Sequence, residues 1–340
     1  MDDRIDEGGA LYPPAARDEG AGPPDARDAL AGLIGSVADG ERACGALLES
    51  GAESVRYLAD KFEDGCRCRD YEDLLDLIDS VGGLARSISA FEALLACKLS
   101  VSADALACCA GITSSEAGGR LCGAARDAVD RVMGSVDEGD AAVSAVIDSG
   151  AAALGAVCHA AGRGCAFMDV GNDEIIRMLD AVNGLTNAAA DVGDVLSGKL
   201  CLCVNALCAG TPDGERCPMD RGRLEERVSS IAMSDRAVSG VIARGAAVYD
   251  CYDIASQPSE IVRRLSGLVD AAMRVGQANS NNLNCALTAL CGVGPTVCCP
   301  CADPCGGAGY VCAGGCVCAG GCDCAGGCDC AGGCGYSRPT

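Results

Sequence analysis

The amino-acid sequence predicts an all-α protein of three tandem helical-hairpin repeats, about six main helices, between a disordered acidic arm and a low-complexity tail rich in cysteine and glycine. Three observations predict this: a segment that occurs three times, an amphipathic stripe that recurs after it, and a cysteine motif of period six near the end. We place the arm at residues 1–28, the repeats at 29–111, 127–210 and 225–292, and the tail at 293–340.

The acidic arm contains the pairs Pro13-Pro14 and Pro23-Pro24, several glycines and many acidic side chains. Such a segment buries too little apolar surface to offset the conformational entropy lost on folding. We therefore expect residues 1–28 to be a disordered, solvating tail.

The first helix of each repeat follows one pattern. The copies begin Ile34-Gly-Ser-Val-Ala-Asp-Gly-Glu-Arg-Ala43, Met133-Gly-Ser-Val-Asp-Glu-Gly-Asp-Ala-Ala142 and Val228-Ser-Ser-Ile-Ala-Met-Ser-Asp-Arg-Ala237. They end Leu47-Leu-Glu-Ser-Gly-Ala52, Val146-Ile-Asp-Ser-Gly-Ala151 and Val241-Ile-Ala-Arg-Gly-Ala246. Internal repetition of this kind indicates units that share one core. The glycine that recurs in the second set predicts a close approach between helices, because glycine otherwise weakens a helix.

The second helix recurs over residues 74–99, 175–200 and about 258–283. Its apolar residues step by three or four, which is the stripe of an amphipathic helix. The third copy departs from the stripe at Asn279. We expect these stripe residues to be buried: Leu77, Val81, Leu84, Phe91, Met178, Val182, Leu185 and Val192.

The charge balance restricts the partners. Asp and Glu number 48 against 26 Lys and Arg, a formal charge of −22 that nucleic acid and anionic membranes repel. We expect no nucleic-acid partner and no membrane span, because Asp148 interrupts the best apolar run at 141–158. The start, Met-Asp-Asp-Arg-Ile-Asp-Glu, does not resemble a conventional signal peptide.

Catalytic motifs are not found. The single histidine, His159, stands near a predicted helix end and is interpreted as a packed or capping residue. No phosphate-binding Gly-Lys-Ser/Thr motif occurs, and a zinc-protease helix would need two histidines. The sequence therefore predicts a protein that is not an enzyme and uses no cofactor.

The 28 cysteines are the dominant anomaly, because a reducing cytosol normally keeps thiols free. The isolated Cys44, Cys97, Cys201 and Cys285 are interpreted as small buried side chains. Cysteines in connectors and in the Cys-Ala-Gly-Gly-Cys repeats of the tail have no core to enter, so they predict cross-linking or metal ligation. These candidates are Cys66, Cys68, Cys298, Cys299, Cys301, Cys305, Cys312, Cys316, Cys318, Cys322, Cys324, Cys328, Cys330 and Cys334.

The stretch Ser36-Val-Ala-Asp-Gly-Glu-Arg-Ala-Cys-Gly-Ala-Leu-Leu-Glu-Ser-Gly-Ala-Glu-Ser-Val55 resembles a helical repeat of spore-surface proteins from spore-forming Firmicutes. Ser230-Ile-Ala232 and the helix ends Lys98-Leu99 and Lys199-Leu200 are similar to that family as well. The resemblance implies a building block of a spore coat, exosporium or appendage. It also implies synthesis in the mother-cell cytoplasm and a final place outside the spore, where disulfides can form.

We therefore expect a structural protein that self-assembles into a disulfide-cross-linked spore-surface or extracellular layer or fibre. Its partners would be further copies of itself and other cysteine-rich surface proteins. The alternative is a soluble thiol-rich store that binds Cu(I) or Zn(II), since Cys-x-Cys clusters are soft-metal ligands.

The tail yields a first prediction. Its eight repeat cysteines, Cys312 to Cys334, all have even numbers, so an extended strand would place them on one face. Neighbours would then be about 6.6 or about 13 Å apart, at or beyond the reach of a disulfide, which favours bonds between chains. Deletion of residues 306–340 is expected to leave the helical part folded and to abolish reductant-sensitive multimers on non-reducing gels. Unchanged multimers would assign the cross-links to other cysteines.

Overall fold

The protein is seen in a computed structural model that describes residues 26–65, 67–109, 123–162, 172–208, 221–251 and 258–291. The helices are α1 (Ala26–Gly65), α2 (Cys68–Cys109), α3 (Gly123–Gly162), α4 (Asn172–Cys208), α5 (Arg221–Cys251) and α6 (Pro258–Cys291). Every described residue except Arg67 is helical, which confirms the all-α class and the helical hairpins. The N-terminal helix begins at Ala26, so residues 26–28 of the predicted arm are helical; the rest of the arm and the tail lie outside the described residues.

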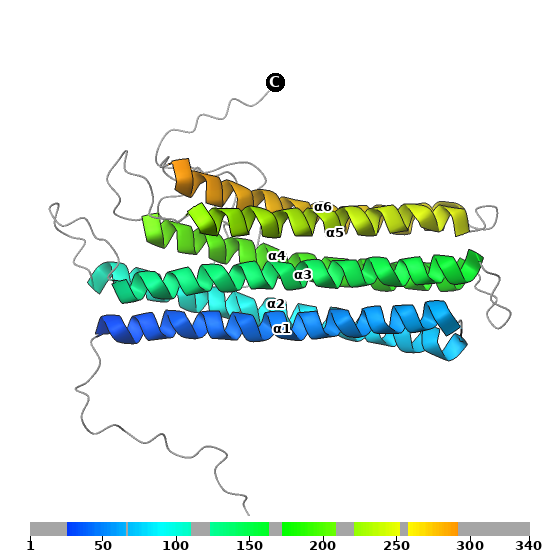
Figure 1. Cartoon of the computed structure of the whole chain (residues 1–340), viewed down its shortest axis with the longest axis horizontal. Coiled ribbons are helices and arrows are strands. Elements are labelled where there is room, and N and C mark those ends of the chain that lie inside the picture. The colour runs from blue at the N-terminus through cyan, green and yellow to red at the C-terminus, as the bar shows by residue number, and fades with distance from the viewer. Residues whose placement is uncertain are drawn as a thin grey trace, which may run out of the picture.

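The six helices form two parallel layers (Figure 1). Helices α1, α3 and α5 lie side by side in one layer, and α2, α4 and α6 in the other. Each helix of the first layer also contacts the next helix in sequence, so α1–α2, α3–α4 and α5–α6 are antiparallel hairpins, called here hairpins 1, 2 and 3. The predicted array of hairpins is therefore a stack in chain order, with hairpin 2 between the other two.

The recurring glycine of the first helices has the same role in all three hairpins. A Cβ atom on Gly51 would lie 3.2 Å from Val81, and one on Gly150 would lie 3.1 Å from Val182. One on Gly245 would lie 3.3 Å from Leu265 and 2.8 Å from Leu268, one helical turn further along α6. Val81, Val182 and Leu265 occupy the same repeat position of the second helices. Each lies seven residues after the start of its repeat segment, at residue 74, 175 or 258. The prediction of close helix approach at this glycine is confirmed.

A second equivalent contact explains why Asn279 breaks the apolar stripe. In hairpins 1 and 2 a leucine packs over a glycine, Leu95 on Gly40 and Leu196 on Gly139. The corresponding pair in hairpin 3 is Asn279 and Ser234, and the Asn279 amide donates a hydrogen bond of 3.0 Å to the serine hydroxyl. Both members of the pair have become polar, so the buried amide has a partner.

The stripe prediction is confirmed in part. Val81, Met178, Val182, Leu185 and Val192 are buried. Leu77 and Leu84 are partly buried and pack against the core. Phe91 is an error in the prediction, because 44% of it is exposed. Its equivalent in hairpin 2 is buried, so the periodicity was correct and the exposure arises from the end position of hairpin 1.

Helix α3 is the central helix of the array and contacts α1, α4 and α5. By length and composition its segment Ala124–Gly162 would also suffice to cross a membrane. In the structure 67% of its most apolar window is buried by the neighbouring helices, as is usual for the core helix of a soluble protein. Burial in the array thus accounts for its apolar character.

The glycine contact yields a second prediction. Replacing Gly150 with leucine should lower the free energy of unfolding by about 1–3 kcal/mol, because the new side chain meets Val182 in a closely packed seam. The control is Gly184→Leu in α4, where an added Cβ meets no atom within 4 Å. That change should raise the free energy by about 0.5–1 kcal/mol through helix propensity alone. Urea unfolding followed by circular dichroism measures both; equal effects would contradict the close approach.

Candidate functional site

A cluster of buried charges lies where hairpins 1 and 2 meet. The side chains of Lys199 (α4), Glu41 (α1) and Glu92 (α2) are almost wholly removed from solvent. The Lys199 ammonium donates to a carboxylate oxygen of Glu92, and it lies 3.6 Å from Glu41 Oε1. Ser135 of α3 donates a hydrogen bond of 2.8 Å to Glu41 Oε2. The cluster thus joins four helices from two hairpins.

The cluster holds two carboxyl groups and one ammonium group, so it has one carboxyl group more than the ammonium can neutralise. Burial raises the pKa of Glu41 to about 7, and the opposing effects of Lys199 and Ser135 do not cancel it. Burial also lowers the pKa of Lys199, against the attraction of Glu41. Near neutral pH the Glu41 carboxyl can therefore hold a proton, which leaves one ion pair between Lys199 and Glu92.

A second buried cluster lies where hairpins 2 and 3 meet. Arg227 of α5 is buried, and its guanidinium lies 2.7 Å from Asp137 and 2.6 Å from Asp140, both in α3. The amide of Asn282 in α6 donates a hydrogen bond of 3.2 Å to Asp140. Burial raises the pKa of Asp140, and Arg227 opposes this rise. The donors and acceptors again come from different hairpins.

The two clusters are built on equivalent repeat positions. Glu41 and Asp140 share one position of the first helices, and Lys199 and Asn282 share one position of the second helices. In each junction the acid of one hairpin thus meets a donor from the next hairpin, at 3.6 Å and 3.2 Å. The buried polar contacts form a repeated junction between hairpins rather than a constellation aimed at a ligand.

Surface ion pairs follow the same rule. Arg42 pairs with Glu138 and Arg177 pairs with Glu72, which links hairpins 1 and 2 in both layers. His159 of α3 lies 2.9 Å from Glu63 of α1. The one histidine, interpreted from the sequence as a packed or capping residue, is half-exposed and takes part in a contact between two helices.

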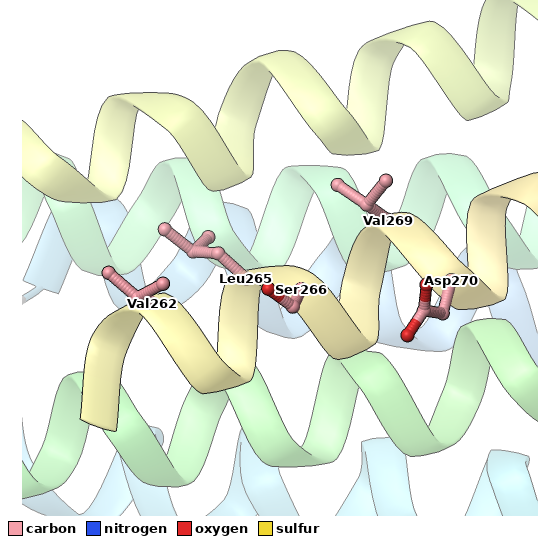
Figure 2. A pocket seen from close by; sticks show the side chains of 5 residues that line it. All are labelled: Val262, Leu265, Ser266, Val269 and Asp270. Atoms are coloured by element: carbon pink, nitrogen blue, oxygen red, sulfur yellow. The ribbon is translucent and has the colours of Figure 1, made fainter. Parts of the chain in front are cut away.

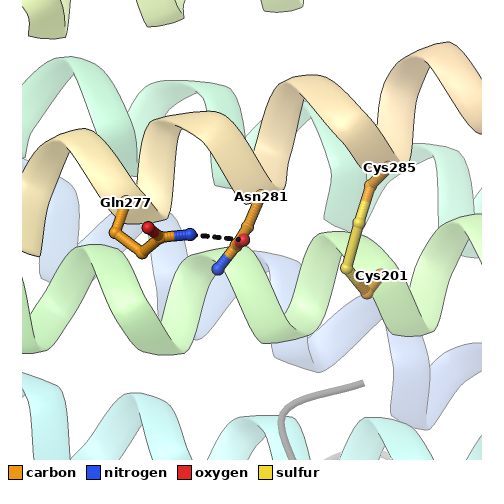
Figure 3. The surroundings of a disulfide bond; sticks show 4 residues. All are labelled: Cys201, Gln277, Asn281 and Cys285. Atoms are coloured by element: carbon orange, nitrogen blue, oxygen red, sulfur yellow. Dashed lines mark hydrogen bonds between the residues drawn. A yellow bond between two sulfur atoms is a disulfide. The ribbon is translucent and has the colours of Figure 1, made fainter. Parts of the chain in front are cut away.

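Cysteines also bridge the hairpins. Cys201 of α4 and Cys285 of α6 form a disulfide between hairpins 2 and 3, with their Cα atoms 5.8 Å apart (Figure 3). Both are buried as expected, but they are bonded rather than packed as separate thiols. Cys97 is disulfide-bonded as well. Cys44 and Cys203 are buried thiols, and burial raises the pKa of each, so both are protonated at neutral pH.

Of the cross-linking candidates named from the sequence, Cys68 alone lies within the described part of the chain. Cys68 is the first residue of α2. Cys66 and the tail cysteines, from Cys298 to Cys334, lie outside the described residues. Within the described residues, no three His, Cys, Asp or Glu side chains gather into a group that could hold a metal ion.

Sequence reasoning missed the buried charges. Charged side chains normally mark the surface, so Lys199 was noted only as part of a helix end. A signal was nevertheless present: the chain has only three lysines, and Lys98 and Lys199 share a repeat position. A rare residue at a repeated position indicates a contact that the repeat itself requires.

An open pocket lies on the outer side of α6 (Figure 2). It is lined by Val262, Leu265, Ser266, Val269 and Asp270, which all come from this one helix. Three of the five side chains are apolar, and Asp270 is the ionisable one. The pocket is a part of the outer face of hairpin 3 that no neighbouring helix covers.

The Glu41 cluster yields a third prediction. At pH 5 folded Glu41 holds a proton that the unfolded chain, with an ordinary pKa of 4.5, has mostly lost, so the free energy of unfolding falls as pH rises toward 7. Glu41→Gln removes this dependence and keeps the Ser135 hydrogen bond. The variant should lie within about 1 kcal/mol of wild type at pH 5 and exceed it by up to about 3 kcal/mol at pH 7.5. Urea unfolding at each pH measures this, with the exposed Glu49→Gln as control; parallel pH curves for wild type and Glu41→Gln would contradict it.

Comparison with known proteins adds little. No family model and no curated protein matches the chain. Among solved structures, the chain is matched to one described as "Computational Design of Self-Assembling Cyclic Protein Homooligomers", at 13% sequence identity. The match covers 75% of this chain and 99% of that one, with a TM-score of 0.16. At so low a score nothing about this chain's assembly follows from the likeness.

Proposed function

We propose that this chain is a non-enzymatic structural protein that self-assembles into a disulfide-cross-linked layer or fibre on the spore surface or outside the cell. The observation that carries the proposal is the Cys201–Cys285 disulfide, which fastens one hairpin to the next inside the array. A chain that is cross-linked even in its packed part suits an oxidising destination. Its tail has further cysteines at a regular spacing, which could form disulfide bonds to other chains.

The polar interior supports a structural role. The buried charges Glu41, Glu92, Lys199 and Arg227 contact one another or other side chains across the hairpin junctions. A catalytic acid or base needs access to a substrate, and these groups are enclosed by packed helices. Their arrangement supports a role in fixing the stack.

The destination rests on the resemblance to spore-surface proteins together with the disulfides. Such a protein is made in the cytoplasm and becomes oxidised after it reaches the surface. Its partners are further copies of itself and other cysteine-rich surface proteins. The metal-store alternative would rest on the Cys-x-Cys clusters of the tail, because within the described residues no three His, Cys, Asp or Glu side chains form a group that could hold a metal ion.

Localisation and cross-linking test the proposal together. Antibody labelling of intact spores should place the protein on their surface, and extraction should release it only with reductant. The extracted protein should run as multimers on non-reducing gels and as a single chain on reducing gels. Metal content is measured on the same sample. Soluble, monomeric protein that carries stoichiometric copper or zinc would replace this proposal with the metal-store alternative.

A further inference from the structure

The exposed large hydrophobic side chains among the described residues belong to hairpins 1 and 3, and none belongs to hairpin 2. We call the outer side of hairpin 1 the leading face. It carries Leu33, Leu47, Tyr57 and Phe91, all exposed. Their equivalents in hairpin 2 are buried, since hairpin 1 covers them: Val132, Val146, Ala156 and Val192.

The outer side of hairpin 3 is called the trailing face, and it shows the same relation. It carries the exposed residues Val228, Ile242, Val262 and Val269. The equivalents in hairpin 2 are Met133, Ile147, Leu179 and Thr186, and those in hairpin 1 are Ile34, Leu48, Ile78 and Ala85. All eight are buried, because a following hairpin covers them. Each face is thus one half of a junction that the chain already forms twice.

We propose that the trailing face of one copy docks on the leading face of a second copy, as each hairpin docks on the next within the chain. The inference rests on the proposed self-assembling role and specifies its non-covalent interface. Its occupant is a second copy because the leading face is the repeat equivalent of the surface that hairpins 2 and 3 present to the hairpin before them.

The charges on the two faces are complementary at the equivalent positions. Lys98 is exposed on the leading face at the position that Lys199 and Asn282 occupy inside the array. Asp235 is exposed at the position of Glu41 and Asp140, and it now accepts a hydrogen bond from Asn279. Docking would bring this acid and this lysine together, as Glu41 and Lys199 lie 3.6 Å apart at the first junction.

Two further groups match the first junction. Ser36 is equivalent to Ser135, and each hydroxyl lies within hydrogen-bond distance of the carbonyl three residues earlier, so Ser36 is placed to meet Asp235 as Ser135 meets Glu41. Arg236 is equivalent to Arg42, and Asp39 is equivalent to Glu138. Since Arg42 and Glu138 pair at 3.3 Å, the exposed Arg236 and Asp39 form the corresponding pair between copies.

The open pocket on α6 fits the same junction. Ser266 in its lining is equivalent to Gly82 and Asn183. Both of these contact the next hairpin: a Cβ on Gly82 would lie 3.7 Å from the Leu185 backbone, and Asn183 lies against Gly267. The pocket in Figure 2 is therefore the place where the second helix of a following hairpin would lie.

Because the leading and trailing faces differ, the contact between copies is heterologous. It would extend into an open filament unless it closes into a ring.

The inference is tested with two full-length variants, each of which has one of the two faces blocked. Reducing conditions are used so that disulfide-linked multimers do not form. Leu47→Arg blocks the leading face, where Leu47 is 53% exposed, and Val262→Arg blocks the trailing face, where Val262 is 49% exposed. Both changes reduce the net charge of −22, so lost assembly cannot come from added repulsion. In sedimentation velocity at moderate salt, wild type should form long assemblies and each variant alone should stay monomeric. An equimolar mixture should give a one-to-one dimer through the two intact faces.

The control is Met233→Arg, because Met233 is 42% exposed and its equivalent Glu138 pairs with Arg42 of the preceding hairpin, so this position of hairpin 3 belongs to the side that meets hairpin 2 and not to the trailing face. It should assemble like wild type. A dimer formed by either blocked variant alone, a monomeric mixture, or equal loss of assembly in the control would overturn the inference. A wild-type protein that stays monomeric under reducing conditions would also overturn the inference. If the oxidised protein still formed disulfide-linked multimers, the proposed function would stand without this interface.

Charge reversal provides a second measurement that does not depend on the apolar variants. Lys98→Glu and Asp235→Lys should each weaken assembly by about tenfold or more, because like charges then meet at the junction. The two changes in one chain should restore assembly toward the wild-type level, since the pair is then reversed in every junction. Failure of the double variant to recover would assign the single effects to something other than this pairing. Unchanged helicity in circular dichroism confirms that each variant folds.

Discussion

Each helical hairpin of this chain has two apolar flanks, and only a neighbouring hairpin can remove a flank from water. A pair of helices with few aromatic side chains, 3% of the chain, cannot enclose its own core. Hairpin 2 is the unit for which the requirement is met on both flanks, and its exposed surface carries no large hydrophobic side chain among the described residues. The two layers, the central place of α3 and the apolar ends of the stack all follow from this single constraint.

The seams inside and between hairpins both have closely packed apolar side chains, and those between hairpins add buried charges. Within a hairpin, glycine lets the helices approach closely, as Gly51 does against Val81. Between hairpins, buried ionisable groups meet, as Lys199 does with Glu92 and Glu41. A buried charge without its partner is strongly destabilising, so such groups permit one register and penalise a slip by a helical turn. Apolar packing thus supplies the stability of the stack, and the ions specify its alignment.

Much of the fold could be predicted from the sequence, because repetition and helical period are local signals. The hairpins, the close contact at Gly150 and the break at Asn279 could all be predicted from the sequence. The exposure of Phe91 was not, since periodicity tells which side of a helix faces a neighbour but not whether that neighbour exists. The burial of Lys199 was hidden by the general association of charge with the surface. The bond between Cys201 and Cys285 could not be derived either, because pairing depends on distances across the stack.

The junctions of the stack are chemically distinct, and this matters for how the chain reaches its native state. Neighbouring units of like sequence can pair wrongly during folding, with one unit taking the place of another. Here the first junction requires Lys199 and the second requires Arg227, which lies at the repeat position of Val132 and Leu33. If hairpin 3 took the place of hairpin 2, the Arg227 guanidinium would meet Glu41 at the position of Asp140 but would lack its second acid, because Ala38 stands at the position of Asp137. The native order of the hairpins is therefore favoured by charge, because a misplaced hairpin 3 would bury the Arg227 guanidinium with one of its two acids missing.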